Sequence, residues 1–149
     1  MAKEIERKFL VKGTEWRKGH FKLIRQFYLV STKSFSMRIR LHGKLAFLTL
    51  KGGSGTLIRE EFETPIPFSL AQRLLNLHKH KKQIQKKRFH YRYKGFVWEI
   101  DEFLGANKGL VVAEIELKRA NQKFPLPPWI AKEVTHDKRY LNVNLAKKV

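Results

Sequence analysis

No cysteine occurs among the 149 residues, so the chain forms neither disulfide bonds nor thiolate metal sites. Long apolar runs are also missing, since nowhere do roughly 18 apolar residues follow one another as a membrane span requires. The first ten residues, "MAKEIERKFL", are charged and lack the apolar core of a signal peptide. We therefore expect a soluble, cytoplasmic protein without a membrane partner.

Acidic residues are scarce as well. Asp and Glu number 13 against 32 Lys and Arg, which gives a formal net charge of +19 at pH 7. This excess predicts an anionic partner, whether nucleic acid, acidic lipid or polyphosphate, and charge alone does not choose among them. With 42% hydrophobic and 12% aromatic residues, the composition is that of an ordered protein. The length suits a single domain over residues 1–149.

Alternation of apolar and polar residues is the dominant pattern of the chain. It predicts strands over residues 3–11, 21–30, 35–41, 45–51, 57–64, 84–93, 96–103 and 110–118. About eight strands are enough to close an antiparallel barrel. Helices are predicted over "SLAQRLLNLHK" (residues 69–79), over "PPWIAKEV" (residues 127–134), and from about Asp137 toward the C-terminal end.

Acidic residues stand in pairs two positions apart on these strands, and side chains at that spacing share one face. Eight of the 13 acidic residues follow this rule: Glu4 and Glu6, Glu61 and Glu63, Glu99 and Asp101, and Glu114 and Glu116. One interpretation is a set of solvated outer faces with cross-strand salt bridges. The other is the interior of a barrel, because the reverse faces are aromatic or aliphatic and helices are available to cover some of them.

An inward arrangement would have a definite chemistry. Mg²⁺ binds through a few carboxylates together with substrate phosphates, and Lys and Arg hold phosphate oxygens as point charges and bidentate forks. So many cations in one enclosure would repel one another without a polyanion between them. A metal ion and a phosphate-rich substrate would therefore complete such a site.

The strand motifs occur in a fixed order: "EIERKFLV", "MRIRL", "LTLK", "REEFE", "KKRF", "EID" and "AEIEL", followed by "EVTHDKRYLN". In this order the chain resembles, over nearly its whole length, the CYTH domain of the triphosphate tunnel metalloenzyme superfamily. The resemblance implies an α+β, mainly β fold: a closed antiparallel barrel of about eight strands that forms a tunnel, with a few flanking helices. It also implies a repertoire of inorganic triphosphatase, thiamine triphosphatase and adenylate cyclase activities.

The resemblance assigns roles residue by residue. Triphosphate contacts fall to basic residues: Lys8, Arg38, Arg40, Lys51, Arg59, Lys86, Arg88, and Lys138 or Arg139. A divalent metal, Mg²⁺ or Mn²⁺, falls to acidic residues: Glu4, Glu6, Asp101, Glu114 and Glu116, with Glu61 and Glu63 at a second position. The catalytic group is Glu4, Glu6, Glu114, Glu116 and Lys86. Glu99 lies on the same strand face according to the period-two alternation, but the resemblance assigns it no role.

We expect metal-assisted hydrolysis of a terminal phosphoanhydride, with water attacking in line and basic side chains stabilising the transferred group. The short chain and its "DKRYLN" motif look most like bacterial inorganic tripolyphosphatases, which favours tripolyphosphate as the substrate. Adenylate cyclase and thiamine or nucleoside triphosphatase activities are the alternatives within the family. They need a pocket for a ring, and we interpret Trp98 and Trp129 as core packing instead.

A non-catalytic polyphosphate or nucleic-acid binding module is the alternative from another class. Residues 78–94, "HKHKKQIQKKRFHYRYK", interleave cations with aromatic residues, as single-strand binders do. Against it, Phe89 and the following tyrosines fall on the face opposite Lys86, and a nucleic-acid groove has no use for paired carboxylates. We interpret His78 and His80 as surface residues rather than zinc ligands, and the sequence leaves the oligomeric state open.

Overall fold

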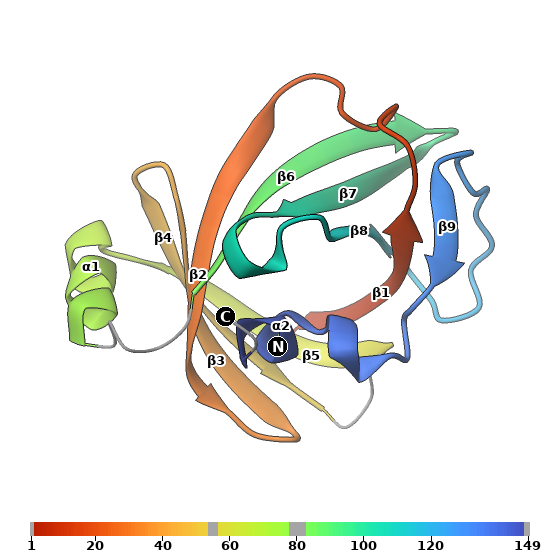
Figure 1. The fold of residues 1–149 in the computed structure, drawn as a ribbon. Helices are drawn as coiled ribbons and strands as arrows, with labels where there is room; N and C mark the ends of the chain where they lie inside the picture. Colours follow the sequence, from red (N-terminus) through yellow and green to blue (C-terminus); the bar gives the residue numbers. More distant parts are fainter. Residues whose placement is uncertain (1, 54–56, 78–82, 148–149) are drawn as a thin grey trace.

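A computed structural model describes residues 2–53, 57–77 and 83–147. Its antiparallel strands form a closed barrel (Figure 1), in the spatial order β5-β4-β3-β2-β6-β7-β8-β1, and a pairing of β5 with β1 closes the ring. The strands are β1 (Ala2–Val11), β2 (Phe21–Ser31), β3 (Phe35–His42), β4 (Leu45–Gly52), β5 (Ile58–Ile66), β6 (Ile84–Tyr93), β7 (Phe96–Phe103) and β8 (Val111–Glu116). The predicted barrel of the mainly β, α+β class is confirmed.

Strand β1 divides one of its edges between two partners. Its first residues pair with β5, from Ala2 to Ile5, and its last residues pair with a ninth strand, β9 (Ile130–Glu133). The other edge pairs with β8. After β9 the chain returns to the barrel, where the amide of Lys8 donates to the hydroxyl of Thr135 at 3.0 Å. This hydrogen bond holds the segment after β9 against β1 at Lys8.

Residues 127–134 include β9, so the prediction of a helix there is wrong. The amide of Lys12 donates to the carbonyl of Trp129 at 2.9 Å, and the amide of Val134 donates to the carbonyl of Lys8 at 2.8 Å. These bonds satisfy the part of the β1 edge that β5 leaves free. Two successive prolines before Trp129 suit either a first helical turn or an edge segment, so the local pattern does not separate the two.

Helix α1 (Phe68–Leu77) covers the outer face of the barrel beside β2, β3 and β4 (Figure 1). Its buried Ala71 packs with Phe27 and Ile39. The helix predicted over residues 69–79 is confirmed as far as the described residues extend, and residues 78–82, with both histidines of that stretch, lie outside them.

The helix predicted from about Asp137 begins later than expected. A single 3-10 turn spans Lys138–Tyr140, and α2 (Asn142–Lys147) follows it. The carboxylate of Asp137 accepts a hydrogen bond from the amide of Arg139 and so caps the turn. Within the described ranges, neither helix has the length and apolarity that crossing a membrane would demand.

Helix α2 seals an apolar layer at one end of the barrel interior. Its Leu145 and Ala146 form a buried cluster with three strand residues: Ile84, Phe103 and Val112. Each of the three stands two positions from a charged residue and so shares its face: Lys86, Asp101 and Glu114. The charged part of the interior therefore ends on an apolar floor beneath the C-terminal helix.

A larger apolar cluster covers the outside of β1, β6, β7 and β8. Trp98 and Trp129 are 0% and 2% exposed, and their ring centroids lie 5.8 Å apart in an edge-to-face arrangement. Burial of both rings confirms their interpretation as core packing. This apolar cluster thus packs against the outer face of the same strands whose inner face carries charged residues.

Candidate active site

The inner face of the barrel is charged along most of its length. Side chains from β1, β3, β4, β5, β6, β7 and β8 surround a cavity of about 250 Å³ that continues into a narrower space of about 40 Å³ near α2. We call this space the tunnel. Its charged lining residues are Lys3, Glu4, Glu6, Lys8, Arg38, Arg40, Lys51, Arg59, Glu61, Glu63, Arg88, Glu99, Glu114 and Glu116. The acidic and basic pairs therefore point inward.

Carboxylates from neighbouring strands oppose one another on one wall of the tunnel. Glu6 lies opposite Glu116, and Glu99 lies opposite Glu114. Burial, together with the charges of Glu114 and Glu4, raises the pKa of Glu6 well above its ordinary value. Like charges directly opposite each other destabilise a sheet. This wall, the acidic wall, therefore favours a bound cation or a proton.

Glu4 and Glu61 share the ammonium group of Lys51. The Nζ atom of Lys51 lies 3.0 Å from Glu4 Oε1 and 3.5 Å from Glu61 Oε2. A hydrogen bond to Glu4, together with burial, raises the pKa of Glu61 to about 7. Burial also raises the pKa of Glu4, but the hydrogen bond with Glu61 and the charge of Lys51 outweigh it and lower the pKa to about 2. The pair therefore holds a proton that a metal ion would displace.

Asp101 joins the two deepest cations. One of its carboxylate oxygens lies 2.7 Å from Arg88 Nε, and the other lies 2.8 Å from Arg88 Nη2 and 2.6 Å from Lys86 Nζ. Burial raises the pKa of Asp101, but the charges of Lys86 and Arg88 outweigh it and hold the pKa below its usual range. Burial lowers the pKa of Lys86 to about 7. Because both oxygens of Asp101 are engaged, metal ligation by this residue would require breaking these contacts.

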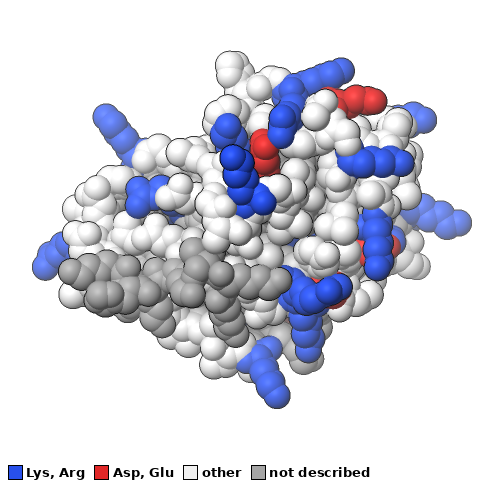
Figure 2. All heavy atoms as spheres, in the orientation of Figure 1, with Lys and Arg blue, Asp and Glu red and all other residues white. Residues whose placement is uncertain are grey.

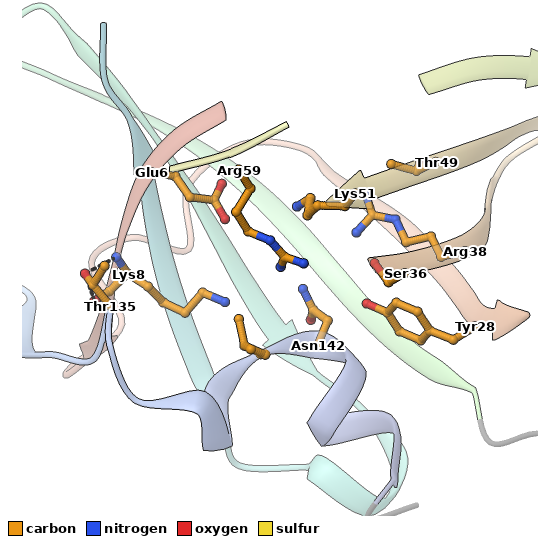
Figure 3. A pocket seen from close by; sticks show the side chains of 11 residues that line it. Glu6, Lys8, Tyr28, Ser36, Arg38, Thr49, Lys51, Arg59, Thr135 and Asn142 are labelled. Carbon is orange, nitrogen blue, oxygen red and sulfur yellow. Dashed lines mark hydrogen bonds between the residues drawn. The ribbon is translucent and has the colours of Figure 1, made fainter. Parts of the chain in front are cut away.

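Hydrogen-bond donors gather at the narrow end of the tunnel, which we call the chamber. Figure 3 shows Arg38, Lys51 and Arg59 directed into it from β3, β4 and β5, with Lys8 entering from β1. The Nε atoms of Arg38 and Arg59 are buried and have no acceptor among the described residues. A buried donor without an acceptor is costly. The chamber is therefore suited to an anion.

The acidic wall offers oxygen atoms to a metal ion. Glu4 Oε2 is buried and receives no hydrogen bond from the described side chains and backbone, and Glu6, Glu114 and Glu116 line the same cavity. A set of carboxylate oxygens suits Mg²⁺ or Mn²⁺. In residues 2–53, 57–77 and 83–147, no three carboxylates or imidazoles already stand in a metal-binding arrangement.

Both sequence and fold match a known family. The model of the CYTH domain matches residues 2–149. The chain belongs to the CYTH domain family. It is 46% identical over 150 residues to the inorganic triphosphatase of Acetivibrio thermocellus, which covers 99% of this chain and 95% of that protein. The inorganic triphosphatase of Nitrosomonas europaea is 37% identical over 96% of each chain. The crystal structure of the inorganic triphosphatase NE1496 aligns with a TM-score of 0.71 at 35% identity, over 100% of this chain and 97% of that one.

Two predicted substrate contacts of this CYTH domain lie away from the tunnel. Lys138 and Arg139 are exposed in the turn before α2, and neither lines the cavity. The guanidinium group of Arg139 lies 2.7 Å from the carboxylate of Asp137. Glu99, which was not assigned from the family, does line the tunnel, and its Oε2 lies 3.2 Å from Arg88 Nη1 and 3.4 Å from His90 Nε2.

Uncharged polar residues in the tunnel of this CYTH domain were missed. They are Tyr28, Ser36, Thr49, Thr135 and Asn142. Ser36 stands two positions from Arg38, and Thr49 stands two positions from Lys51. Each therefore shares a strand face with a predicted substrate contact, so the period-two pattern does carry a signal for them. Thr135 and Asn142 belong to the segment after β9, and no local pattern indicates that this segment returns to the barrel.

Gln26 is a further interior residue without a sequence signal. Its side chain is fully buried on β2, and its Oε1 accepts a hydrogen bond from Arg40 Nε at 3.1 Å. Burial, together with the charges of Arg38 and Arg88, lowers the pKa of Arg40 to about 10. Gln26 therefore holds the guanidinium group of Arg40 at its Nε atom, while Arg40 lines the tunnel.

The net positive charge of this CYTH domain lies outside its tunnel. With Lys86 and Asp101 included, the tunnel holds eight basic and eight acidic side chains, so its formal charges cancel. Of the 32 Lys and Arg side chains 27 are described, which leaves 19 outside the tunnel against five acidic ones. Three of those five pair with an Arg. Figure 2 shows the Lys and Arg side chains spread over the face in view, with few acidic ones among them.

The basic stretch over residues 78–94 forms no aromatic platform in its described part, residues 83–94. Phe89 is 6% exposed and packs edge-on against Trp16, with ring centroids 5.3 Å apart. Tyr91 packs in the same way against Trp129 at 5.4 Å. Arg88 lines the tunnel on the opposite face of β6. The predicted separation of cations and aromatic rings on this strand is confirmed.

Proposed function

We propose that this CYTH domain is an inorganic triphosphatase that hydrolyses the terminal phosphoanhydride of tripolyphosphate. The observation that carries the proposal is that the tunnel contains both buried donor atoms and a buried acceptor atom without hydrogen-bond partners. The Nε atoms of Arg38 and Arg59 are buried donors and the Oε2 atom of Glu4 is a buried acceptor, and among the described residues no N–H, hydroxyl or acceptor oxygen pairs with these three atoms. An anion satisfies the former and a cation the latter, and tripolyphosphate with a divalent cation supplies both. Relatives at 46% and 37% identity that carry the name inorganic triphosphatase support this choice of substrate.

The basic residues of the tunnel have the role of holding the substrate. Phosphate oxygens would accept hydrogen bonds from the side chains Lys8, Arg38, Arg40, Lys51, Arg59 and Arg88. Arginine suits this task because its planar fork donates two parallel bonds to one phosphate. Enclosure strengthens each of these interactions relative to water, and the same donors stabilise charge in the transferred group.

We assign the divalent cation, Mg²⁺ or Mn²⁺, to the acidic wall. The residues that would hold it are Glu4, Glu6, Glu114 and Glu116, with Glu61 and Glu63 at a second position. When bound, such an ion neutralises phosphate charge and acidifies coordinated water. Glu6, whose pKa is raised by burial and by the charges of Glu114 and Glu4, would have to be ionised to hold such an ion.

Lys86 is our candidate for the group that accepts a proton from the attacking water. Its lowered pKa of about 7 leaves part of the population neutral near pH 7. Asp101 and Asn142 fix the amine by contacts of 2.6 and 3.4 Å. Water would then attack the terminal phosphorus in line, and the bond to the bridging oxygen would break to release phosphate and pyrophosphate.

Phosphate release by the purified protein tests the proposal. The substrates are tripolyphosphate, pyrophosphate, ATP and thiamine triphosphate, each with Mg²⁺, Mn²⁺ or EDTA. We expect metal-dependent release from tripolyphosphate well above the others. An Arg59→Met variant should lose most of this activity, whereas Arg73→Met, at an exposed position of α1, should keep it. No release from any substrate, with tight binding of RNA or long polyphosphate instead, would overturn the proposal.

A further inference from the structure

The segment after β9 reaches both deep lysines of the tunnel. The Nζ atom of Lys8 donates to the carbonyl of Tyr140 at 3.1 Å, and the Nζ atom of Lys86 donates to Oδ1 of Asn142 at 3.4 Å. Asn142 also lines both the wide cavity and the chamber. The segment contributes this amide from outside the barrel strands, at a point where the strands supply mainly charged groups.

The contact with Lys86 fixes the direction of the Asn142 amide. In this contact the amine donates, so the oxygen of the amide faces it and the nitrogen is left for the opposite side. Figure 3 shows that nitrogen directed into the chamber, toward Arg59. Among the described residues, Asn142 Nδ2 has no acceptor. Two donors that face each other lack the acceptor that would satisfy both.

We propose that Asn142 is a substrate-binding residue whose side-chain nitrogen donates a hydrogen bond to a phosphate oxygen held in the chamber. This inference rests on the proposed function, because it requires a triphosphate in the tunnel. The amide adds a donor without adding charge to a space where Arg38, Lys51 and Arg59 already repel one another. The helix that carries it is anchored, since Leu145 is buried in the apolar floor.

Two substitutions separate this role from a purely structural one. Asn142→Ala removes the donor and the acceptor together. Asn142→Asp keeps an acceptor for Lys86 but replaces the donor with a negative charge. Asn144→Ala is the matched control, because Asn144 lies on the same helix, donates to the carbonyl of Lys138 at 2.6 Å and lines neither part of the tunnel.

The measurements are KM for tripolyphosphate with Mg²⁺ and calorimetric Kd for tripolyphosphate in EDTA, with the thermal midpoint of every variant as a check on folding. We expect Asn142→Ala to raise both constants roughly tenfold, the worth of one hydrogen bond to a charged group. Asn142→Asp should raise them at least as much. Asn144→Ala should stay within about twofold of the unmodified chain.

Several results would overturn the inference. If Asn142→Asp binds tripolyphosphate as well as the unmodified chain does, the residue acts only through Lys86. If Asn142→Ala and Asn144→Ala weaken binding equally, the effect belongs to the stability of α2. A chain that releases no phosphate from tripolyphosphate refutes the proposed function instead, and the Kd comparison in EDTA still decides the role of Asn142.

Discussion

Metal binding in the tunnel should release protons, and Glu61, at the second metal position, sets the pH range in which it does so. Its pKa of about 7 in the metal-free protein arises from its hydrogen bond to Glu4 and from burial, whereas a carboxylate that ligates a metal must be ionised. Each pH unit below 7 therefore weakens apparent metal binding about tenfold, the equivalent of about 1.4 kcal/mol. Glu6, whose pKa is also raised, adds to the same trend. Between pH 8 and pH 6 we expect the affinity for Mn²⁺ to fall at least tenfold.

Titration calorimetry with Mn²⁺, in buffers of different ionisation enthalpy, measures both the affinity and the protons released. Glu61→Gln removes one titrating group and should make the pH dependence shallower. Glu60→Gln, at an exposed position on the outer face of the same strand, should leave it unchanged. An affinity that stays constant between pH 6 and pH 8 in the unmodified chain would refute the reasoning. Because the folded pKa of Glu61 is raised, its contribution to the stability of the metal-free protein is lost as the pH rises from about 4.5 to about 7.

Three further predictions concern the tunnel and its surroundings. Glu116→Gln should lower kcat about a hundredfold at saturating Mg²⁺ in a phosphate-release assay, and unchanged turnover would remove Glu116 from the metal site. Asp101→Asn should lower the free energy of unfolding by roughly 3–5 kcal/mol in urea, because Lys86 and Arg88 lose their buried partner; a change below about 1 kcal/mol would contradict that role. Higher ionic strength should lower kcat/KM with little change in kcat, because salt screens the outer charges; an equal fall in both would instead locate the effect in the tunnel.

The barrel and the inward direction of its charged faces could be predicted because alternation along a strand is a local pattern. Strand β9 could not, since what makes residues 130–133 extended is the unpaired end of β1, more than a hundred residues away in the sequence. The same distance hides Asn142, which meets Lys86 only after the chain has passed β9. Spacing along the strand also predicted that Asp101 lies on the inner face. It could not predict that Asp101 binds both Lys86 and Arg88, because those contacts depend on cross-strand register.

Because the formal charges inside the tunnel cancel, the chemistry of this CYTH domain does not depend on its high net positive charge. Chemistry depends on a balanced set of inward side chains, each held by a strand, whereas the excess of cations sits on outer positions that few interior contacts constrain. Substitutions on the outer surface, such as those made for solubility, should therefore leave the chemistry within unaltered. Under the proposed function, a relative with an acidic exterior and the same interior would catalyse the same reaction and differ chiefly in how quickly its substrate arrives.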